Sequence, residues 1–413
     1  MIVLSGAELV LPDRILSPGT LVIDGGRIVD IRPGAAPTTS AFAFHGHYIV
    51  PGFVDVHVHG VEGIDSLQAG EAIASIAARV PRYGVTAFCP TTVACAPDAL
   101  RRVLEQVGRA REAPRPGAAR VLPAHLESNF VNPEFRGAQP AACLRSPRAA
   151  LDAAIGHDAG LKGERPAGAP FDAGDILREI ERASPDVGIV TIAPELDGAL
   201  DLIAWLLARG HRVSLGHSGA GYDEALSAIA AGARHATHLF NRMPPLGHRA
   251  PGLVGAILET EQVAAELICD GFHVHPALVR TTVAAKRPSR VLAITDGTAA
   301  AGLPPGSVTS LGDETITAGA TAALLRDGTV AGSLLTMDGA FRMLVERAGL
   351  SLVDAATMCA TTPARELGLV GHGMLAVDGI ADVVIVDQRL SVVQTYIGGQ
   401  LAYARGGEAT PPV

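Results

Sequence analysis

Cysteine is scarce in this chain of 413 residues, and its few copies follow no pattern. There are five, an odd number, and no two of them form a Cys-x-x-Cys pair. Disulfide frameworks and thiolate zinc sites need several cysteines at short, regular spacings. The sequence therefore argues against both kinds of site, and we expect buried or inert thiols at Cys89, Cys95, Cys143, Cys269 and Cys359.

Long apolar runs and positive charge are also lacking. No run approaches the roughly 18 apolar residues of a membrane span, and the start, MIVLSGAELVLPDRIL, lacks the basic segment of an export signal. Lys plus Arg (33) are outnumbered by Asp plus Glu (42), and the formal charge of −9 is spread without blocks. We therefore expect a cytoplasmic protein that binds neither nucleic acid nor an anionic membrane.

Eight short apolar runs through the middle of the chain each stop on a polar residue. Helical or turn-rich stretches separate them, which is typical of a (β/α)8 TIM-like barrel of the α/β class. Apolar residues at helical spacing predict helices at 71–80, 97–112, 172–183, 198–209, 222–231 and 276–286. Reactive groups of such barrels lie at the carboxyl ends of the strands. We therefore expect the residues on which the runs stop to lie around one mouth of the barrel: His57, His59, Thr91, Glu127, Glu195, His217, His238, Asp270 and Asp296.

The two ends of the chain share a different texture of short strands and turns, with a hairpin turn predicted at Asp24-Gly25-Gly26. We predict that residues 1–50 and 364–413 together build a small β-sandwich, and that residues 51–363 form the barrel. The hydrophobic content of 48% is enough to form a buried core in the β-sandwich and in the barrel. Residues 137–175 are rich in Ala, Pro and Gly without a clear period, which predicts an excursion after the third strand.

A His-x-His pair ends the first barrel strand. Strict alternation would place Asp55, His57 and His59 on one face of the strand, and Val56 and Val58 on the other. Neutral imidazoles at i and i+2 suit zinc or iron, although an isolated pair is as often two hydrogen-bonded core histidines. This pair is not isolated. Four more strand ends carry a group that can ligate a metal, namely Glu127, His217, His238 and Asp296. Together these residues predict a metal-dependent hydrolase barrel.

Two other histidines on these strands are interpreted differently. His235 is out of phase with His238, so we expect it to face the helix layer in a structural role. His125 shares the phase of Glu127, so we expect it to point inward, beside the metal ligands.

Only two lysines occur, Lys162 and Lys286, and neither ends a strand. A carboxylated lysine bridging two metal ions is therefore excluded, and Glu127 is the best remaining bridge. One divalent ion would bind Glu127, His217 and His238, which leaves an open position for water as in catalytic zinc sites. A second ion would bind His57, His59, Glu127 and Asp296, and Asp296 is also a natural general base. The sequence thus predicts one or two ions per chain, zinc first, with iron, cobalt or manganese as alternatives.

Around these residues the chain resembles the amidohydrolase superfamily and, more narrowly, the N-acetylglucosamine-6-phosphate deacetylases. The shared motifs are PGFVDVHVHG (51–60), HLESNFVNPEFRGA (125–138), TIAPE (191–195), SLGHS (214–218), THLFNRMPP (237–245), APGLVGAI (250–257), CDGFHVHP (269–276) and ITDG (294–297). The resemblance implies deacetylation of an N-acetylhexosamine 6-phosphate, with the principal metal on Glu127, His217 and His238. It also implies that Asp296 is the acid/base and that Asn241, Arg249 and His273 bind the sugar phosphate, Arg249 from the neighbouring subunit of a homodimer.

The chain departs from this family at several positions. Ser128-Asn129 stand where relatives have Gly-Pro, Gln139 where they commonly have His, and Arg242 where they tend to have Ala. We expect Gln139 and Arg242 to contact the substrate, and their departures leave open a different N-acyl amino sugar, such as N-acetylgalactosamine 6-phosphate, or another small amide. A non-catalytic barrel that has lost its ligands is the remaining alternative, and the complete ligand set argues against it.

Overall fold

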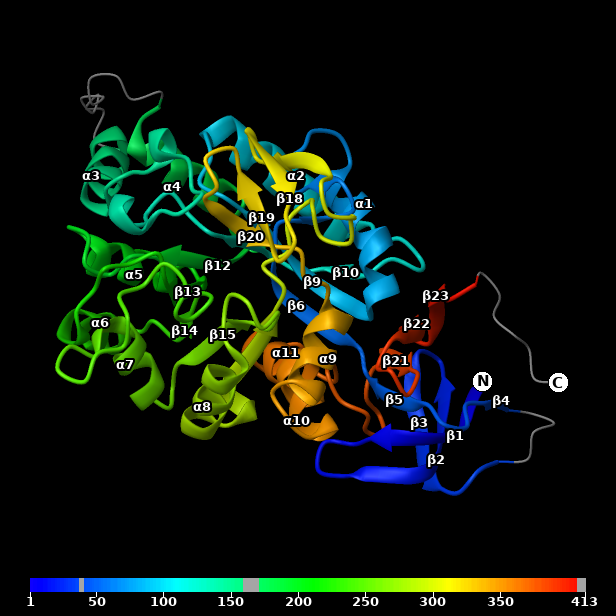
Figure 1. Cartoon of the computed structure of the whole chain (residues 1–413). Helices are drawn as coiled ribbons and strands as arrows, with labels where there is room; N and C mark the ends of the chain where they lie inside the picture. The colour runs from blue at the N-terminus through cyan, green and yellow to red at the C-terminus, as the bar shows by residue number, and fades with distance from the viewer. Residues whose placement is uncertain (37–40, 159–170, 407–413) are drawn as a thin grey trace.

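The computed structural model describes residues 1–36, 41–158 and 171–406. A β-module made from both ends of the chain lies beside a larger α/β barrel, as predicted (Figure 1). Within these ranges, no helix combines the length and the apolar character needed to cross a membrane.

Eight parallel strands form the nearly closed barrel, and each pairs with the next in chain order. The ring closes between its last and first strands, where Asp296 N donates to His57 O (2.9 Å) and Val58 bridges Gly297. The short β10 (Arg120–Val121) adds to β9 at one edge. The barrel strands are β6 (Phe53–Val58), β9 (Val85–Thr92), β11 (Ala124–Leu126), β12 (Val187–Ile192), β13 (Arg212–Leu215), β14 (His235–Ala236), β15 (Ala264–Ile268) and β16 (Val291–Ile294).

The helices around the barrel follow the predicted apolar spacing closely. The predictions 97–112 and 276–286 match α2 (Pro97–Glu112) and α8 (Pro276–Lys286) to the residue. Four others are confirmed within one or a few residues, namely α1 (Ala72–Arg79), α4 (Ala173–Arg182), α5 (Ala199–Ala208) and α6 (Tyr222–Ala230). The helix α7 (Gly252–Glu259) was not predicted.

The segment after β16 adds a second layer at the barrel mouth. Its four antiparallel strands are β17 (Val308–Leu311), β18 (Glu314–Ala318), β19 (Ala322–Leu325) and β20 (Val330–Ser333). A bridge between Ser333 and Gly297 ties β20 to the end of the last barrel strand. The chain then continues through α9 (Met337–Glu346), α10 (Leu352–Ala356), a π-helical turn (Thr357–Thr361) and α11 (Thr362–Glu366).

The terminal β-module joins residues that are more than 300 positions apart. Its strand β5 pairs antiparallel with β21, and Val50 faces Val384 there. The hairpin turn is confirmed, because Gly25 (φ 54°) and Gly26 (φ 79°) adopt the left-handed backbone that glycine tolerates. The module's strands are β1 (Ile2–Val10), β2 (Ile15–Asp24), β3 (Arg27–Pro33), β4 (Phe42–Ala43), β5 (Tyr48–Pro51), β21 (Val383–Val386), β22 (Val392–Ile397) and β23 (Gln400–Ala404). The domain boundaries at 50/51 and 363/364 remain a prediction.

One local prediction needs correction. Strict alternation along β6 is wrong, because its pairing with β9 shifts register twice, between Phe53 and Val54 and between Asp55 and Val58. Val56 consequently packs with the barrel interior, and the Asp55 carboxylate accepts from the Thr295 hydroxyl (2.6 Å). The excursion predicted at 137–175 lies between β11 and β12, after the third barrel strand. It contains a regular helix, α3 (Pro147–Asp158), while its residues 159–170 lie outside the described ranges.

Candidate active site

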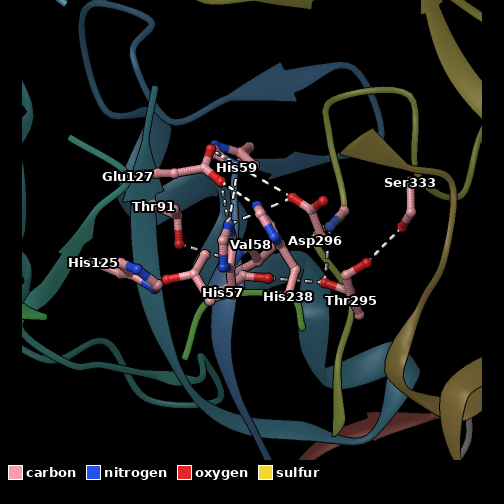
Figure 2. A network of polar contacts seen from close by, with 12 residues as sticks. His57, Val58, His59, Thr91, His125, Glu127, His238, Thr295, Asp296 and Ser333 are labelled. Carbon is pink, nitrogen blue, oxygen red and sulfur yellow. Dashed lines mark hydrogen bonds and ion pairs between the residues drawn. The ribbon is translucent and has the colours of Figure 1, made fainter. Parts of the chain in front are cut away.

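The carboxylate of Glu127 stands at the centre of a buried cluster at the barrel mouth (Figure 2). Its Oε1 lies 2.8 Å from Nε2 of His217 and 2.7 Å from Nε2 of His238, and the two imidazole nitrogens are 3.1 Å apart. These three side chains come from the ends of β11, β13 and β14, which lie within four consecutive strands of the barrel, so all three ends share one stretch of the rim. They are the first predicted metal set, brought together by the fold.

The second predicted set lies against the first (Figure 2). The Nε2 atoms of His57 and His59 are 3.3 Å apart, and Asp296 Oδ1 lies 3.4 Å from the former and 3.2 Å from the latter. Glu127 Oε2 is 3.4 Å from His59 Nε2, so Glu127 borders both sets, as expected of a bridge.

The electrostatics of the cluster favour a bound cation. Burial keeps His57 neutral by lowering its pKa to about 4. Burial also opposes charge on His59, but Asp296 and Glu127 outweigh it and raise the pKa of His59 to about 10. Burial resists ionisation of Glu127 as well, yet His217 and the other imidazoles hold its pKa well below the usual range. The carboxylates thus draw positive charge into a buried site, as a proton or as a metal ion.

The donor set fits a divalent metal. The Nε2 atoms of His217 and His238 converge on the same carboxylate oxygen at hydrogen-bond distance, and each set of three has its ligand atoms within 4.8 Å of one another. A cation placed between these atoms would satisfy the lone pairs of the imidazoles and of the carboxylate together. The ring of His217 is already oriented for this, because its Nδ1 lies 2.9 Å from Phe135 O and so leaves Nε2 to face the centre.

Several of these residues adopt a backbone conformation that is rare outside glycine. His217 (φ 48°), His238 (φ 29°) and Asp296 (φ 48°) all have positive φ. Each lies two residues beyond the end of a barrel strand, where the chain turns and the side chain faces the mouth. Such conformations are unfavourable and persist where surrounding contacts fix them, often at functional sites.

Glu266 is a component of the site that the sequence reasoning missed. This fully buried carboxylate lies on β15, and its Oε2 is 3.0 Å from Nδ1 of His57. The contact directs Nε2 of His57 toward Asp296 and Glu127. A charged residue inside the apolar run VAAELIC was the available signal. His125 lies beside this pair, with its ring centroid 4.5 Å from that of His57.

Other strand-end residues support the site from outside the ligand cluster. Glu195 accepts from Asn132 Nδ2 (2.8 Å), Gly219 N (2.6 Å) and Ser218 Oγ (2.7 Å), which braces the loop after His217. Thr91 Oγ1 accepts from Val58 N at 2.9 Å. The remaining histidine on β14, His235, is buried with its Nε2 3.7 Å from Glu366 of α11.

A cavity of about 560 Å³ opens above the cluster. His59, Glu127, His217, His238 and Asp296 line its floor, and the predicted substrate residues Gln139, Asn241, Arg242 and His273 line its walls. Arg249 is exposed and is not part of this lining. His275, two residues after His273, caps α8 by accepting from Ala277 N.

Two of the wall residues have distinctive surroundings. His273 Nδ1 lies 2.6 Å from Asp270 Oδ2, while its Nε2 is buried without a hydrogen-bond partner among the described residues. Arg242 donates to Val330 O (3.3 Å), and no carboxylate of the described residues lies within ion-pair distance of it. Of the described residues that line the cavity, Arg242 is the only arginine or lysine.

Comparisons with known proteins agree with this geometry. The sequence model of the amidohydrolase family matches residues 48–402 of this chain. The chain is 34% identical to human N-acetylglucosamine-6-phosphate deacetylase, covering 97% of this chain and 94% of the relative. It is 33% identical to an N-acetylgalactosamine-6-phosphate deacetylase of Escherichia coli O157:H7, covering 97% and 99%. It superposes with a TM-score of 0.85 and 32% identity on a mutant N-acetyl-D-glucosamine-6-phosphate deacetylase from Mycobacterium smegmatis in complex with N-acetyl-D-glucosamine-6-phosphate, covering 98% and 99%.

Proposed function

This chain belongs to the amidohydrolase family and, within it, to the N-acetylglucosamine-6-phosphate deacetylases, and we propose that it hydrolyses the acetamide of N-acetylglucosamine 6-phosphate to glucosamine 6-phosphate and acetate. One observation carries the proposal. Glu127, His217 and His238 converge beside Asp296 on the floor of a cavity whose wall includes His273, with an Nε2 that has no hydrogen-bond partner among the described residues.

Glu127, His217 and His238 would hold the principal divalent ion, zinc first. His57, His59, Glu127 and Asp296 would hold a second ion. When bound, the metal supplies Lewis-acid polarisation of the acetamide carbonyl and activates a water molecule.

Asp296 supplies the proton transfer. Burial resists its ionisation, but His59 and His57 outweigh burial and hold its pKa below 3.8, so the group is a carboxylate at neutral pH. A carboxylate at this position can accept a proton from the attacking water at Oδ1 and then deliver it to the nitrogen of the leaving amine. Delivery to nitrogen makes the amine a competent leaving group, and the C–N bond breaks.

The cavity wall would bind the sugar phosphate. His273 is oriented by Asp270, and its Nε2 has no hydrogen-bond partner among the described residues, which suits it to a phosphate oxygen. Asn241 also lines the cavity. We propose that Arg249, exposed on its loop, reaches the site of a neighbouring copy, which requires a homodimer. A guanidinium is suited to this contact because its fork matches phosphate geometry.

We place the enzyme in the cytoplasm. All five cysteines are free, and four of them are buried, which fits a reducing compartment.

Turnover of a panel of sugars tests the proposal. We expect metal-loaded protein to release acetate from N-acetylglucosamine 6-phosphate far faster than from the unphosphorylated sugar. Comparable or faster turnover of N-acetylgalactosamine 6-phosphate would favour the alternative substrate. No turnover of any N-acyl sugar, together with no bound metal, would show a non-catalytic barrel.

A further inference from the structure

Gln139 lies in the wall of the cavity, but its side chain is already committed to the protein. Only 2% of the residue is exposed, and its Oε1 accepts from Ala94 N at 2.6 Å. A backbone N–H can only donate, so the atom facing Ala94 must be the amide oxygen. The amide nitrogen is thereby turned to Glu127, where it donates to Oε2.

The main chain around Gln139 is fixed as firmly as its side chain. Gln139 N donates to Arg136 O (3.0 Å), and Arg136 Nη1 donates back to Gln139 O (3.1 Å). Asn129, one of the departures from the family, donates from Nδ2 to Cys95 O (2.8 Å) and Cys143 O (2.7 Å). The segment carrying Gln139 is therefore tied to the segment carrying Ala94, and the amide spans two loops of fixed separation.

This arrangement determines which oxygen of Glu127 faces the principal site. Gln139 holds Oε2, and the backbone and side-chain contacts above leave it no other position. Rotation of the carboxylate would break that contact, so Oε1 stays directed to His217 (2.8 Å) and His238 (2.7 Å). Groups that orient a metal ligand in this way commonly raise metal affinity 10- to 100-fold.

We propose that Gln139 is a positioning residue for Glu127, and that its amide, oriented by the Ala94 N–H, presents Oε1 to the metal together with His217 and His238. This differs from the substrate contact predicted from the sequence, because the acceptor atom of Gln139 is not available to a sugar hydroxyl. The inference concerns metal binding alone and does not depend on the proposed substrate.

Zinc affinity, measured by competition with a chelator in the absence of substrate, tests the proposal on the full-length protein. Gln139→Leu removes both hydrogen bonds at similar volume, and we expect it to lower zinc affinity 10- to 100-fold. Gln139→His retains an N–H donor and should lose less. The absorption spectrum of the cobalt-loaded protein should change in Gln139→Leu, because the carboxylate can then rotate.

Gln106 provides a matched control. It is also a buried glutamine whose oxygen accepts from a backbone N–H, at Ile73 (3.4 Å), and whose nitrogen donates to Gln68 O (3.0 Å), but it lies between helices away from the cluster. Gln106→Leu should reduce thermal stability without changing zinc affinity. If Gln139→Leu does not fold, Gln139→Asn, which is one methylene too short to span the two loops, replaces it with the same expectation.

Equal zinc affinity in wild type and Gln139→Leu, or equal losses in the Gln139 and Gln106 variants, would overturn the proposal. Unchanged zinc affinity with a raised KM would show that Gln139 contacts the substrate and does not position Glu127. A wild-type protein that binds zinc but hydrolyses no N-acyl sugar would contradict the proposed function and leave this inference standing.

Discussion

Asp296 and His59 form a buried pair, with 3.2 Å between Oδ1 of the carboxylate and Nε2 of the imidazole. The pair sits beside Glu127 but outside the set formed by Glu127, His217 and His238. Metal binding at the principal site and proton transfer by Asp296 can therefore be separated by mutation.

Asp296→Asn should retain the fold and the principal metal but lose most of the turnover, since an amide cannot accept the proton of water. Loss of a general acid/base typically costs 10²–10⁴-fold, and more where the same group also ligates a metal. Steady-state kinetics and elemental analysis of one preparation measure both effects. Activity within a few-fold of wild type would show that Asp296 is only a ligand or a turn residue.

The histidine sets should differ in what they bind. His217→Ala should remove the principal ion, whereas His57→Ala or His59→Ala should mainly reduce occupancy of the second ion. Elemental analysis after reconstitution with excess zinc would show this. His235→Ala is the control, because His235 is buried outside the ligand cluster and should leave the metal content unchanged. Loss of all metal in every variant would indicate unfolding and not ligand removal.

Arg249→Ala should weaken substrates that carry a phosphate and hardly affect the unphosphorylated sugar. A charge-assisted contact of this kind corresponds to about ten- to a hundredfold in kcat/KM. Mixing the weakened Arg249→Ala protein with the Asp296→Asn protein should restore some activity on the phosphorylated sugar if Arg249 works across a dimer. As a control, Arg389→Ala removes an exposed arginine from the terminal module and should leave kcat/KM unchanged for both kinds of substrate. Equal losses on both substrates would show that Arg249 is structural.

Arg242 should influence which sugar is preferred. Its guanidinium lines the cavity without a carboxylate partner in the described residues, so it favours substrates with additional negative charge or a different hydroxyl geometry. N-Acetylglucosamine 6-phosphate should be accepted, and Arg242→Ala should change its rank among the phosphorylated glucosamine, galactosamine and mannosamine derivatives. Arg326→Ala, on the neighbouring hairpin but outside the lining, is the control. An unchanged ranking of the three sugars would show that Arg242 does not influence which substrate is preferred.

Asp65 should make stability depend on pH. Burial raises its pKa to about 6 from the ordinary 3.8, so the folded state holds this proton more tightly than the unfolded state. The wild-type protein should therefore lose stability, relative to Asp65→Asn, as pH rises from about 4 to about 6, and the difference should be constant above that range. Denaturant unfolding of both proteins at several pH values measures this. A difference that does not vary with pH would contradict it.

The residues that could be predicted from the sequence share a local signal. His57, His217, His238 and Asp296 each end an apolar run, and parallel strands of a barrel place all such ends at one rim. Six helices were predicted nearly to their boundaries because their apolar residues recur at the helical period over two or more turns. These features depend on neighbours within a few positions, so the amino-acid order alone specifies them.

Other features depend on contacts between distant segments, and only the tertiary structure decided them. The side chain of Gln139 could have faced a sugar, but the backbone N–H of Ala94, 45 positions away, fixes its amide toward Glu127. Glu266 orients His57 across 209 positions, and the register shifts in β6 turn Asp55 to Thr295 instead of the metal cluster. The sequence determined which side chains reach the barrel mouth. The direction of each polar atom there was decided by hydrogen-bond partners from distant segments, which only the folded barrel brings together. A hydrogen bond acts over about 3 Å and carries no periodic signal along the chain, so the sequence alone does not reveal it.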